Sequence, residues 1–414
     1  GNFTMKLKKV LFAALSFVLL ATACTSVQKH PLIDGDKPLA EWMVESEMKR
    51  FPSPAQIDFI PVGQIKWAYT TGLELLAMKE AAKEYDRPDF AAYAERYYDS
   101  IVQPDGSVIS YAREKYNIDH VCPARPLFEL YERTGETRYK QVIDTVFLQL
   151  QHHPRIAAGG FWHKLRYPQQ MWLDGIYMGQ PFYAEYVMRH VMPVDAEAGK
   201  RYVDDIVNHF VCAARGTYVP ETGLFCHAFD DVRAQFWCDK ETGRSPHTWN
   251  RALGWYAMAI VETLQYLGVN EQTQPMIEIL THIADTLPRY ADPKSGMWYQ
   301  VVEFPGREGN YEESTGSIMY IYTMLKALRL GYLPESYRDA WMERYRQFVD
   351  RFLKVEEDGT ISITSCCAVA GLDTEGTRRD GTYEYYLSEP VRDNDPKATG
   401  PFIWAAMEYE RAQR

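Results

Sequence analysis

The amino-acid sequence predicts an all-α protein whose helices form an (α/α)6 barrel, a closed ring of six helical hairpins. Three observations lead to this fold class. Apolar residues recur with a period of 3.6 through most of the 414 residues, alternating strand patterns are rare, and a short glycine-containing turn returns after successive helix pairs. Because no low-complexity segment interrupts residues 51–414, we expect one domain there.

About eleven segments carry the apolar pattern of a helix. In chain order they are residues 67–85, 90–102, 124–135, 137–153, 175–191, 200–214, 251–267, 275–290, 317–333, 336–353 and 400–412. In a barrel of this kind the inner helices are buried on all sides, whereas the outer helices are amphipathic. The number of segments fits six hairpins.

The recurring turn contains a glycine followed by aromatic or aliphatic residues. It appears at Gly106, Gly160, Gly223, Gly296 and Gly359, at intervals of 54 to 73 residues. A supersecondary unit that returns in this way indicates a repeated architecture. An open α-solenoid is the alternative, but the irregular interval and the aromatic residues of the turns favour closure. We expect the turns to gather at one rim, where loops carry function.

The first residues have the layout of a secretory signal. Lysines precede an apolar run from Val10 to Leu20, and small residues precede Cys24 in "ATAC". This segment is similar to the lipobox of bacterial lipoproteins, so we expect lipidation of Cys24; cleavage without a lipid is the alternative. The predicted parts are a leader and signal peptide at 1–23, a lipoprotein linker at 24–50 and a folded domain at 51–414. The protein would then be exported, to the periplasm or as an anchored outer-membrane lipoprotein of a Gram-negative bacterium.

Composition excludes several classes of partner. A net charge of -11 argues against nucleic acid and against an anionic membrane surface, because both require basic protein surface. We expect membrane contact only through the lipid anchor. Cys226, His227 and Cys238 offer three metal ligands, but no CxxC or HxxxH spacing supports a metal site. The sequence indicates neither a metal nor an organic cofactor, and it gives no oligomeric state.

Residues 171–182, "MWLDGIYMGQPF", place one acid, Asp174, among apolar and aromatic side chains. One interpretation is a helix N-cap, which would stabilise the carboxylate anion. The other is a proton donor, because an environment poor in water raises the pKa of a carboxyl group. The position that would complete a capping box is Tyr177 rather than Glu or Gln. The two interpretations predict opposite shifts of the Asp174 pKa.

Residues 245–259, "SPHTWNRALGWYAMA", bring Trp249, Arg251 and Trp255 together where a helix begins. Indole rings stack on sugars and a guanidinium group grips a carboxylate, so the pattern predicts a site for an acidic sugar. Core packing with a partly buried arginine is the alternative.

Two histidines and a second acid complete the candidates. His163 and His227 each follow a repeat turn, which places both on the expected functional rim, although single histidines are usually structural. Asp119 opens a helix in "YNIDHVCPARP" and is most simply a cap. The convergence of acid, histidine, tryptophan and arginine on one rim is what indicates a catalytic site.

These motifs together resemble glycoside hydrolase family 105, the unsaturated rhamnogalacturonyl hydrolases, with the unsaturated glucuronyl hydrolases of family 88 as more distant relatives. The similar segments occur in family order over residues 65–405 and include "GGFWHKLRYPQQMWLDGIYMGQPF", "GLFCHAFD", "TWNRALGWYAMA" and "RRDGTYEYYLSEPVRDNDPKATGPF". Asn250, Ala252, Leu253 and Phe229 depart from the family pattern, which affects the sugar accommodated rather than the reaction.

The resemblance implies an (α/α)6 barrel and hydrolysis of an oligosaccharide that ends in a Δ4,5-unsaturated uronic acid. An acid protonates C4 of the vinyl ether, water adds at C5, and the hemiketal opens to release the remaining sugar. It assigns the proton transfers to Asp174, with Asp119 assisting. The implied substrate-binding residues are Tyr69, His163, Trp172, His227, Trp249, Arg251 and Trp255.

The sequence leaves three alternatives open. One keeps the reaction but acts on unsaturated glucuronyl residues of other glycans. Another is a non-catalytic glycan-binding lipoprotein that uses the aromatic rim. A sugar epimerase on the same barrel is the third.

Overall fold

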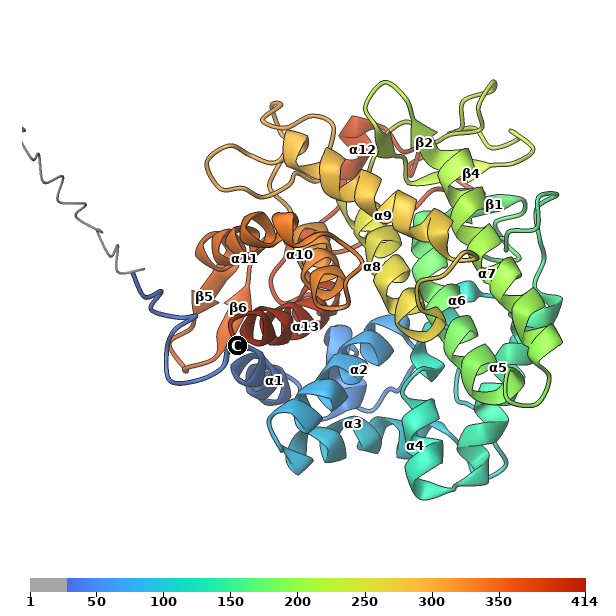
Figure 1. The fold of residues 1–414 in the computed structure, drawn as a ribbon, viewed down its shortest axis with the longest axis horizontal. Helices are drawn as coiled ribbons and strands as arrows, with labels where there is room; N and C mark the ends of the chain where they lie inside the picture. The colour runs from blue at the N-terminus through green and yellow to red at the C-terminus, as the bar shows by residue number, and fades with distance from the viewer. Residues whose placement is uncertain (1–27) are drawn as a thin grey trace, which may run out of the picture. The chain divides into compact units, whose positions relative to one another are not determined.

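Six helices form a closed inner ring in the computed structural model, which describes residues 28–414. Helix α13 packs against α2 and α10, α8 packs against α6 and α10, and the short turn η4 (Cys122–Ala124) before α4 contacts both α2 and α6 (Figure 1). The ring helices are α2 (Tyr69–Glu84), α4 (Leu127–Thr134), α6 (Leu173–Tyr186), α8 (Asn250–Leu267), α10 (Ser314–Arg329) and α13 (Pro396–Ala412).

A second layer of helices lies outside this ring. Helix α3 packs on α2, α5 on α4 and α6, α7 on α6, α9 on α8, α11 on α10 and α1 on α13. Their bounds are α1 (Leu39–Arg50), α3 (Pro88–Ile101), α5 (Thr137–His152), α7 (Ala196–Thr217), α9 (Gln274–Thr286) and α11 (Arg338–Phe352). The predicted all-α fold class, an (α/α)6 barrel, is therefore confirmed.

Sequence explains why a helix takes the inner or the outer layer. Helix α8 reads "NRALGWYAMAIVETLQYL", apolar on nearly every side, and buries all but two of its residues. Helix α11 is rich in arginine and acidic residues and buries a single face. Its buried residues are Trp341, Met342, Tyr345, Phe348, Val349 and Phe352. The apolar area that a helix removes from water thus determines whether the helix lies in the inner or the outer layer.

The folded unit starts before the predicted boundary at residue 51. Residues 36–414 form one compact unit, and α1 buries Leu39, Met43 and Val44 within it. The predicted linker at 24–50 therefore does not extend to residue 50: its last part is a packed helix, which sequence inspection missed. The predicted signal peptide at 1–23 and Cys24 lie outside the described residues.

Four small antiparallel sheets connect the helices at loop positions. The pairs are β1 (Gln170–Trp172) with β4 (Ala228–Asp230), β2 (Tyr218–Val219) with β3 (Leu224–Phe225), β5 (Leu353–Val355) with β6 (Ile361–Ile363), and β7 (Cys366–Cys367) with β8 (Val391–Arg392). The remaining helical turns are η1 (Pro54–Phe59), η2 (Arg113–Lys115), η3 (Ile118–His120), η5 (Val187–Val191), η6 (Leu287–Tyr290), η7 (Glu335–Tyr337) and α12 (Tyr383–Ser388).

The predicted recurring turn is present, with one change. Gly106, Gly223, Gly296 and Gly359 have φ angles between 75° and 84°, the left-handed region that glycine adopts without a steric penalty. In the remaining turn the left-handed residue is Gly159, with a φ of 102°, rather than Gly160.

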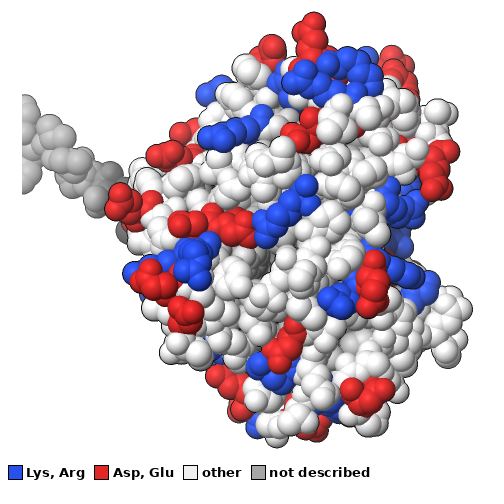
Figure 2. All heavy atoms as spheres, turned by 90° about the vertical axis from the view of Figure 1, so that its right-hand side faces the viewer, with Lys and Arg blue, Asp and Glu red and all other residues white. Residues whose placement is uncertain are grey.

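Charged side chains of both signs lie on the described surface. On the face that carries α5 and α7, basic and acidic side chains are interspersed rather than gathered by sign (Figure 2). None of the helices in residues 28–414 combines the length and apolar character needed to cross a membrane.

Candidate active site

The short ladder of β1 and β4 brings Asp174 and His227 together. Helix α6 starts directly after β1, so Asp174 lies in its first turn, and His227 directly precedes β4. The backbone N–H of Leu173 donates to the carbonyl of His227 at 3.0 Å. The Nε2 atom of His227 lies 3.0 Å from Oδ1 of Asp174, where it donates a hydrogen bond to the carboxylate.

The other nitrogen of His227 contacts a tyrosine from the end of the chain. Nδ1 of His227 lies 2.8 Å from the hydroxyl oxygen of Tyr386, in α12. Both side chains are fully buried. Because a tyrosine hydroxyl both donates and accepts, this contact satisfies His227 whether the ring is neutral or protonated. Asp174, His227 and Tyr386 therefore form a continuous hydrogen-bonded chain.

The structure corrects the raised pKa that the proton-donor interpretation of Asp174 predicts. Burial does raise the pKa of this carboxyl group, and it is the largest contribution. The charge and hydrogen bond of His227, aided by His163, outweigh burial, so the pKa lies below its ordinary value. The N-cap interpretation is also wrong. Trp172 precedes the helix, and α6 has no side-chain N-cap hydrogen bond.

Asp119 forms a second, separately held carboxylate. Its Oδ1 lies 3.3 Å from Nε2 of His163, and its Oδ2 lies 3.0 Å from Nζ of Lys164. Although burial opposes ionisation, these two groups hold the pKa of Asp119 well below its usual range. Its simple interpretation as a helix cap is wrong, because Asn117 caps η3.

The Trp172 ring lies between the histidines that hold the two acids. His163 stacks on it with ring centres 4.6 Å apart, and His227 meets it edge-on at 5.3 Å. Tyr167 stacks on Trp172 at 4.7 Å. The two acid–histidine pairs thus share one aromatic partner, which fixes the orientation of both rings.

Trp249 is a further aromatic neighbour of His227. The two ring centres are 4.8 Å apart, Tyr386 stacks on Trp249 at 6.2 Å, and the indole N–H donates to Oε1 of Gln300 at 3.1 Å. Trp249 directly precedes α8, as predicted.

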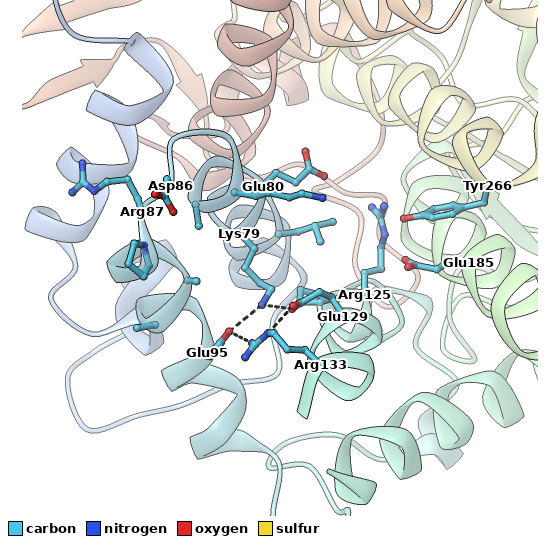
Figure 3. Close-up of a pocket in the computed structure, with 17 residues that line it drawn as sticks. Lys79, Glu80, Asp86, Arg87, Glu95, Arg125, Glu129, Arg133, Glu185 and Tyr266 are labelled. Atoms are coloured by element: carbon cyan, nitrogen blue, oxygen red, sulfur yellow. Dashed lines mark hydrogen bonds and ion pairs between the residues drawn. The ribbon is translucent and has the colours of Figure 1, made fainter. Parts of the chain in front are cut away.

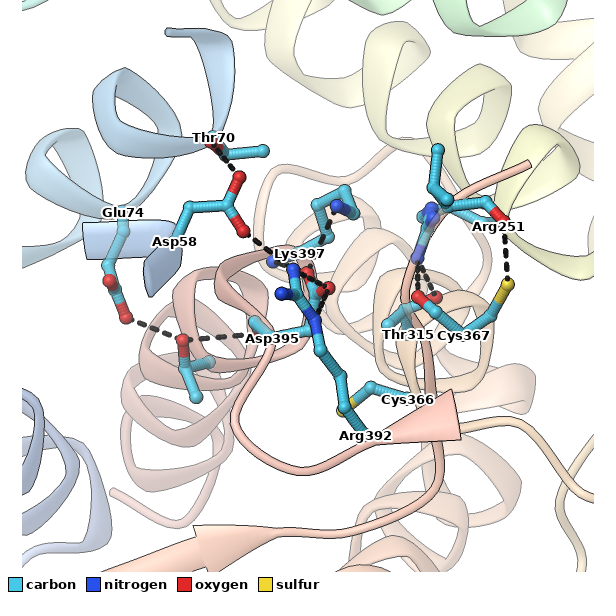
Figure 4. Close-up of polar contacts among 12 residues, drawn as sticks. Asp58, Thr70, Glu74, Arg251, Thr315, Cys366, Cys367, Arg392, Asp395 and Lys397 are labelled. Carbon is cyan, nitrogen blue, oxygen red and sulfur yellow. Dashed lines mark hydrogen bonds and ion pairs between the residues drawn. The ribbon is translucent and has the colours of Figure 1, made fainter. Parts of the chain in front are cut away.

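The guanidinium group of Arg251 lies 4.6 Å from the Trp249 ring centre. It donates to the carbonyl of Cys367 and to the hydroxyl of Thr315 (Figure 4). Only 1% of Arg251 is exposed. Its guanidinium group, which we expected to bind the substrate carboxylate, therefore already donates part of its hydrogen bonds to the protein.

Tyr69 and Trp255 pack against each other at the start of α2 and one turn into α8. Their ring centres are 6.0 Å apart, and Trp255 is buried between Tyr69 and Tyr177. Burial and the negative charge of Asp119 raise the pKa of the Tyr69 hydroxyl. This hydroxyl therefore stays protonated and available to donate a hydrogen bond.

The predicted site residues therefore gather where the inner helices α2, α6 and α8 begin. The acids themselves reach solvent, with 14% of the Asp174 side chain and 15% of the Asp119 side chain exposed. The contacts of Trp249, Arg251 and Trp255 with substrate stay predictions, since all three are almost fully buried.

Two residues of this site were not singled out from the sequence. Lys164 follows His163 in "GGFWHKLRY", so its position beside a predicted residue was the available signal. Tyr386 lies in "GTYEYYLSEP", a similar segment to which no role was assigned, and it is 159 residues from its partner His227.

A cavity lies at the other end of α2, away from Tyr69. It measures about 620 Å³, and Lys79, Glu95, Glu129 and Arg133 form ion pairs with one another across it (Figure 3). None of the predicted site residues lines it, so it is separate from the Asp174 site. Across residues 28–414, no three His, Cys, Asp or Glu side chains are grouped to hold a metal ion.

Comparison with known proteins identifies the family. The model of Glycosyl Hydrolase Family 88 matches residues 39–413. A solved glycoside hydrolase from family 105 of C. acetobutylicum ATCC 824 is 35% identical, with a TM-score of 0.83 over 91% of this chain and 100% of that chain. Protein Atu3128 of Agrobacterium fabrum is 35% identical over 237 residues, 56% of this chain and 97% of that protein.

A more distant structure shares the fold. The unsaturated glucuronyl hydrolase of Bacillus sp. GL1 is 14% identical, with a TM-score of 0.61 over 90% of this chain and 95% of that chain. The resemblance stated from the sequence motifs is confirmed by the family model and by the 35% identical structure. The chain belongs to Glycosyl Hydrolase Family 88 and is a glycoside hydrolase of the family 105 type.

Proposed function

We propose that this protein removes the terminal Δ4,5-unsaturated uronic acid from short oligosaccharides of the rhamnogalacturonan or pectin type. The observation that carries the proposal is the placement of Asp174. It is a partly exposed carboxyl group in the first turn of an inner helix, bonded to His227, which in turn bonds Tyr386. Membership of a family with unsaturated uronyl hydrolases supports the same assignment.

The reaction needs one group that first gives a proton and then takes one. The π electrons of C4=C5 form a C–H bond at C4 with the proton of Asp174, and positive charge develops over C5 and the ring oxygen. Water then forms a bond to C5 and returns a proton to Asp174. The resulting hemiketal breaks its bond between C5 and the ring oxygen, and the acetal carbon then releases the remaining sugar as an alcohol. Asp174 ends in its starting state.

The lowered pKa of Asp174 constrains how the proton arrives. In the free protein the carboxyl group is the anionic partner of His227. The proton of their hydrogen bond lies between Nε2 of His227 and Oδ1 of Asp174. A substrate carboxylate entering beside Asp174 adds negative charge and displaces water, and both effects raise the pKa of a carboxyl group. Substrate binding thus favours protonation of Asp174.

Asp119 supports this site from the other side of Trp172. Its charge is balanced by Lys164 and His163, so it stays ionised and accepts hydrogen bonds from sugar hydroxyls or orients water. Lys164 is the most accessible cation of the site, with 20% of its side chain exposed. We infer that Lys164 contributes, with Arg251, to recognition of the substrate carboxylate.

The experiment follows the ultraviolet absorbance of the conjugated double bond. Unsaturated disaccharides from lyase digestion of rhamnogalacturonan lose this absorbance with the wild-type protein, and Asp174→Asn slows the loss by at least about 10³-fold. Asp231→Asn, which changes an exposed acid following β4, is the matched control and keeps wild-type activity. Wild-type protein that releases no sugar and leaves the absorbance unchanged excludes this function and leaves the glycan-binding alternative.

A panel of disaccharides tests which sugar the enzyme accepts next to the unsaturated uronate. Disaccharides that carry the same unsaturated uronate on rhamnose or on an amino sugar separate the two substrate classes. We expect a higher kcat/KM for the rhamnose-linked compound.

For localisation, we propose export with a lipid on Cys24. Cys24→Ser then moves the expressed full chain from the membrane fraction to the soluble exported fraction. Unchanged membrane attachment contradicts the anchor.

A further inference from the structure

A groove of about 970 Å³ lies on the outside of the barrel, between α7 and α9. The hairpin of β2 and β3 closes one end of it. The groove contains none of the residues placed in the active site. It is nevertheless close to the site along the chain, because β3 ends at Phe225 and His227 follows two residues later.

Three rings form the aromatic wall of this groove. The ring centre of Tyr218 lies 5.5 Å from His282 and 5.6 Å from Phe225, and Phe225 lies 5.9 Å from His282. His282 is held by a 2.7 Å hydrogen bond to the carbonyl of Gly223. Tyr218 is 37% exposed, so the wall offers an exposed ring whose position is fixed by its neighbours.

Two arginines line the same groove, and neither forms a salt bridge among residues 28–414, although the charge of Asp239 acts on Arg244. Arg215, at the end of α7, is exposed. Arg244 uses one nitrogen to donate to the carbonyl of Tyr218 at 2.6 Å. Glu278 is the single acidic residue of the lining. In a chain of net charge -11, this groove therefore carries an excess of positive charge.

We propose that this groove binds a saturated, uronate-bearing segment of an acidic glycan. A sugar ring packs its C–H face against Tyr218, and a uronate carboxylate pairs with Arg215 and Arg244 through charge-assisted hydrogen bonds. The inference rests on the proposed function, since an enzyme for unsaturated uronides works among longer chains of the same polymer. Such a groove would hold the protein on that polymer near the chain ends that lyases produce.

The test is electrophoresis of the full chain through native gels that contain polygalacturonate, with dextran gels as the neutral comparison. The wild-type protein is retarded by polygalacturonate and not by dextran, and added salt reduces the retardation. Arg215→Ala and Tyr218→Ala weaken the apparent affinity by about fivefold each, and Arg215→Glu abolishes retardation. Glu278→Gln strengthens it, because the only acidic residue of the lining is removed.

Controls separate this site from the active site and from general charge effects. Arg289→Ala removes another exposed arginine, in η6 outside the groove, and keeps wild-type retardation. All groove variants keep wild-type kcat/KM on the unsaturated disaccharide, which also shows that they are folded. Equal retardation of wild type and Arg215→Glu, or equal retardation in dextran, overturns the proposal. Retardation without any loss of ultraviolet absorbance contradicts the proposed function but not the groove.

Discussion

Nε2 of His227 lies 3.0 Å from Oδ1 of Asp174, and of these two side chains only that of Asp174 is exposed to solvent. His227 is fully buried, whereas 14% of the Asp174 side chain is exposed. Solvent therefore reaches the acid but not His227, which lowers the pKa of the acid. A substrate that reaches Asp174 displaces water from the carboxyl group without contacting the buried face of His227.

Tyr386→Phe tests whether the buried hydroxyl positions His227. Without it, Nδ1 of His227 loses its hydrogen-bond partner, one of the two contacts that orient Nε2 toward Asp174. We expect kcat to fall by about 10- to 100-fold, with a small change in KM. The measurement is the steady-state rate of ultraviolet loss.

The neighbouring residue supplies the control for this prediction. The Tyr385 hydroxyl accepts a hydrogen bond from the backbone N–H of Gly371 at 2.9 Å and does not contact His227. Tyr385→Phe should keep the wild-type kcat. Equal kcat values for Tyr386→Phe and wild type would show that the Tyr386 hydroxyl only fills space.

Asp119→Asn separates an assisting role from a structural one. The change leaves Lys164 and His163 without their anion, so both groups lose the orientation that Asp119 imposes. Misplacement on this scale lowers kcat by about 10- to 100-fold, clearly less than Asp174→Asn. Steady-state kinetics together with thermal unfolding provide the measurement. A loss equal to that of Asp174→Asn, in a folded protein, would give Asp119 a direct catalytic role.

Glu74→Gln tests a buried carboxyl pair far from the chemistry. Glu47 and Glu74 are fully buried, and burial together with the charge of Glu47 raises the pKa of Glu74 well above its ordinary value. Arg50 contacts Glu47 and Thr399 contacts Glu74, but the second carboxyl oxygen of each has no donor among the described residues.

The sign of this effect on stability follows from the raised pKa. A carboxyl group with a raised folded pKa contributes stability at acid pH, which is lost as pH rises through that pKa. Glu74→Gln removes this loss, so the variant should be more stable than wild type at pH 8, by about 1–3 kcal/mol, and no more stable at pH 4. Thermal unfolding at both pH values measures the difference. A variant destabilised equally at both values contradicts the account.

The sequence predicted the helical part of the fold because apolar periodicity acts over a whole helix. The pattern in residues 251–267 gave α8 to within one residue, and the left-handed turn glycines marked the hairpins. Helix α1 was missed because residues 39–50 mix apolar and charged residues without a clear stripe, and contact with α13 rather than local sequence stabilises it.

The site residues were recognisable one by one, but their connections were not. The contact of Asp174 with His227 depends on a ladder of three residue pairs, too short to show a strand pattern. For the same reason the proton-donor interpretation gave the wrong direction for the Asp174 pKa: its apolar neighbours are adjacent in sequence, whereas His227 is 53 residues away. Tyr386 lies 159 residues from His227 in the sequence, in a helix of only six residues.

Proton delivery to carbon is the central claim, and nuclear magnetic resonance of the reaction in D₂O tests it most directly. We predict that the vinyl signal at C4 disappears at the same rate as the free sugar appears, and that the product carries one deuteron on a single face of C4. Free sugar that appears while the vinyl signal persists in a released monosaccharide would contradict the account, because the glycosidic bond would then break without help from the double bond.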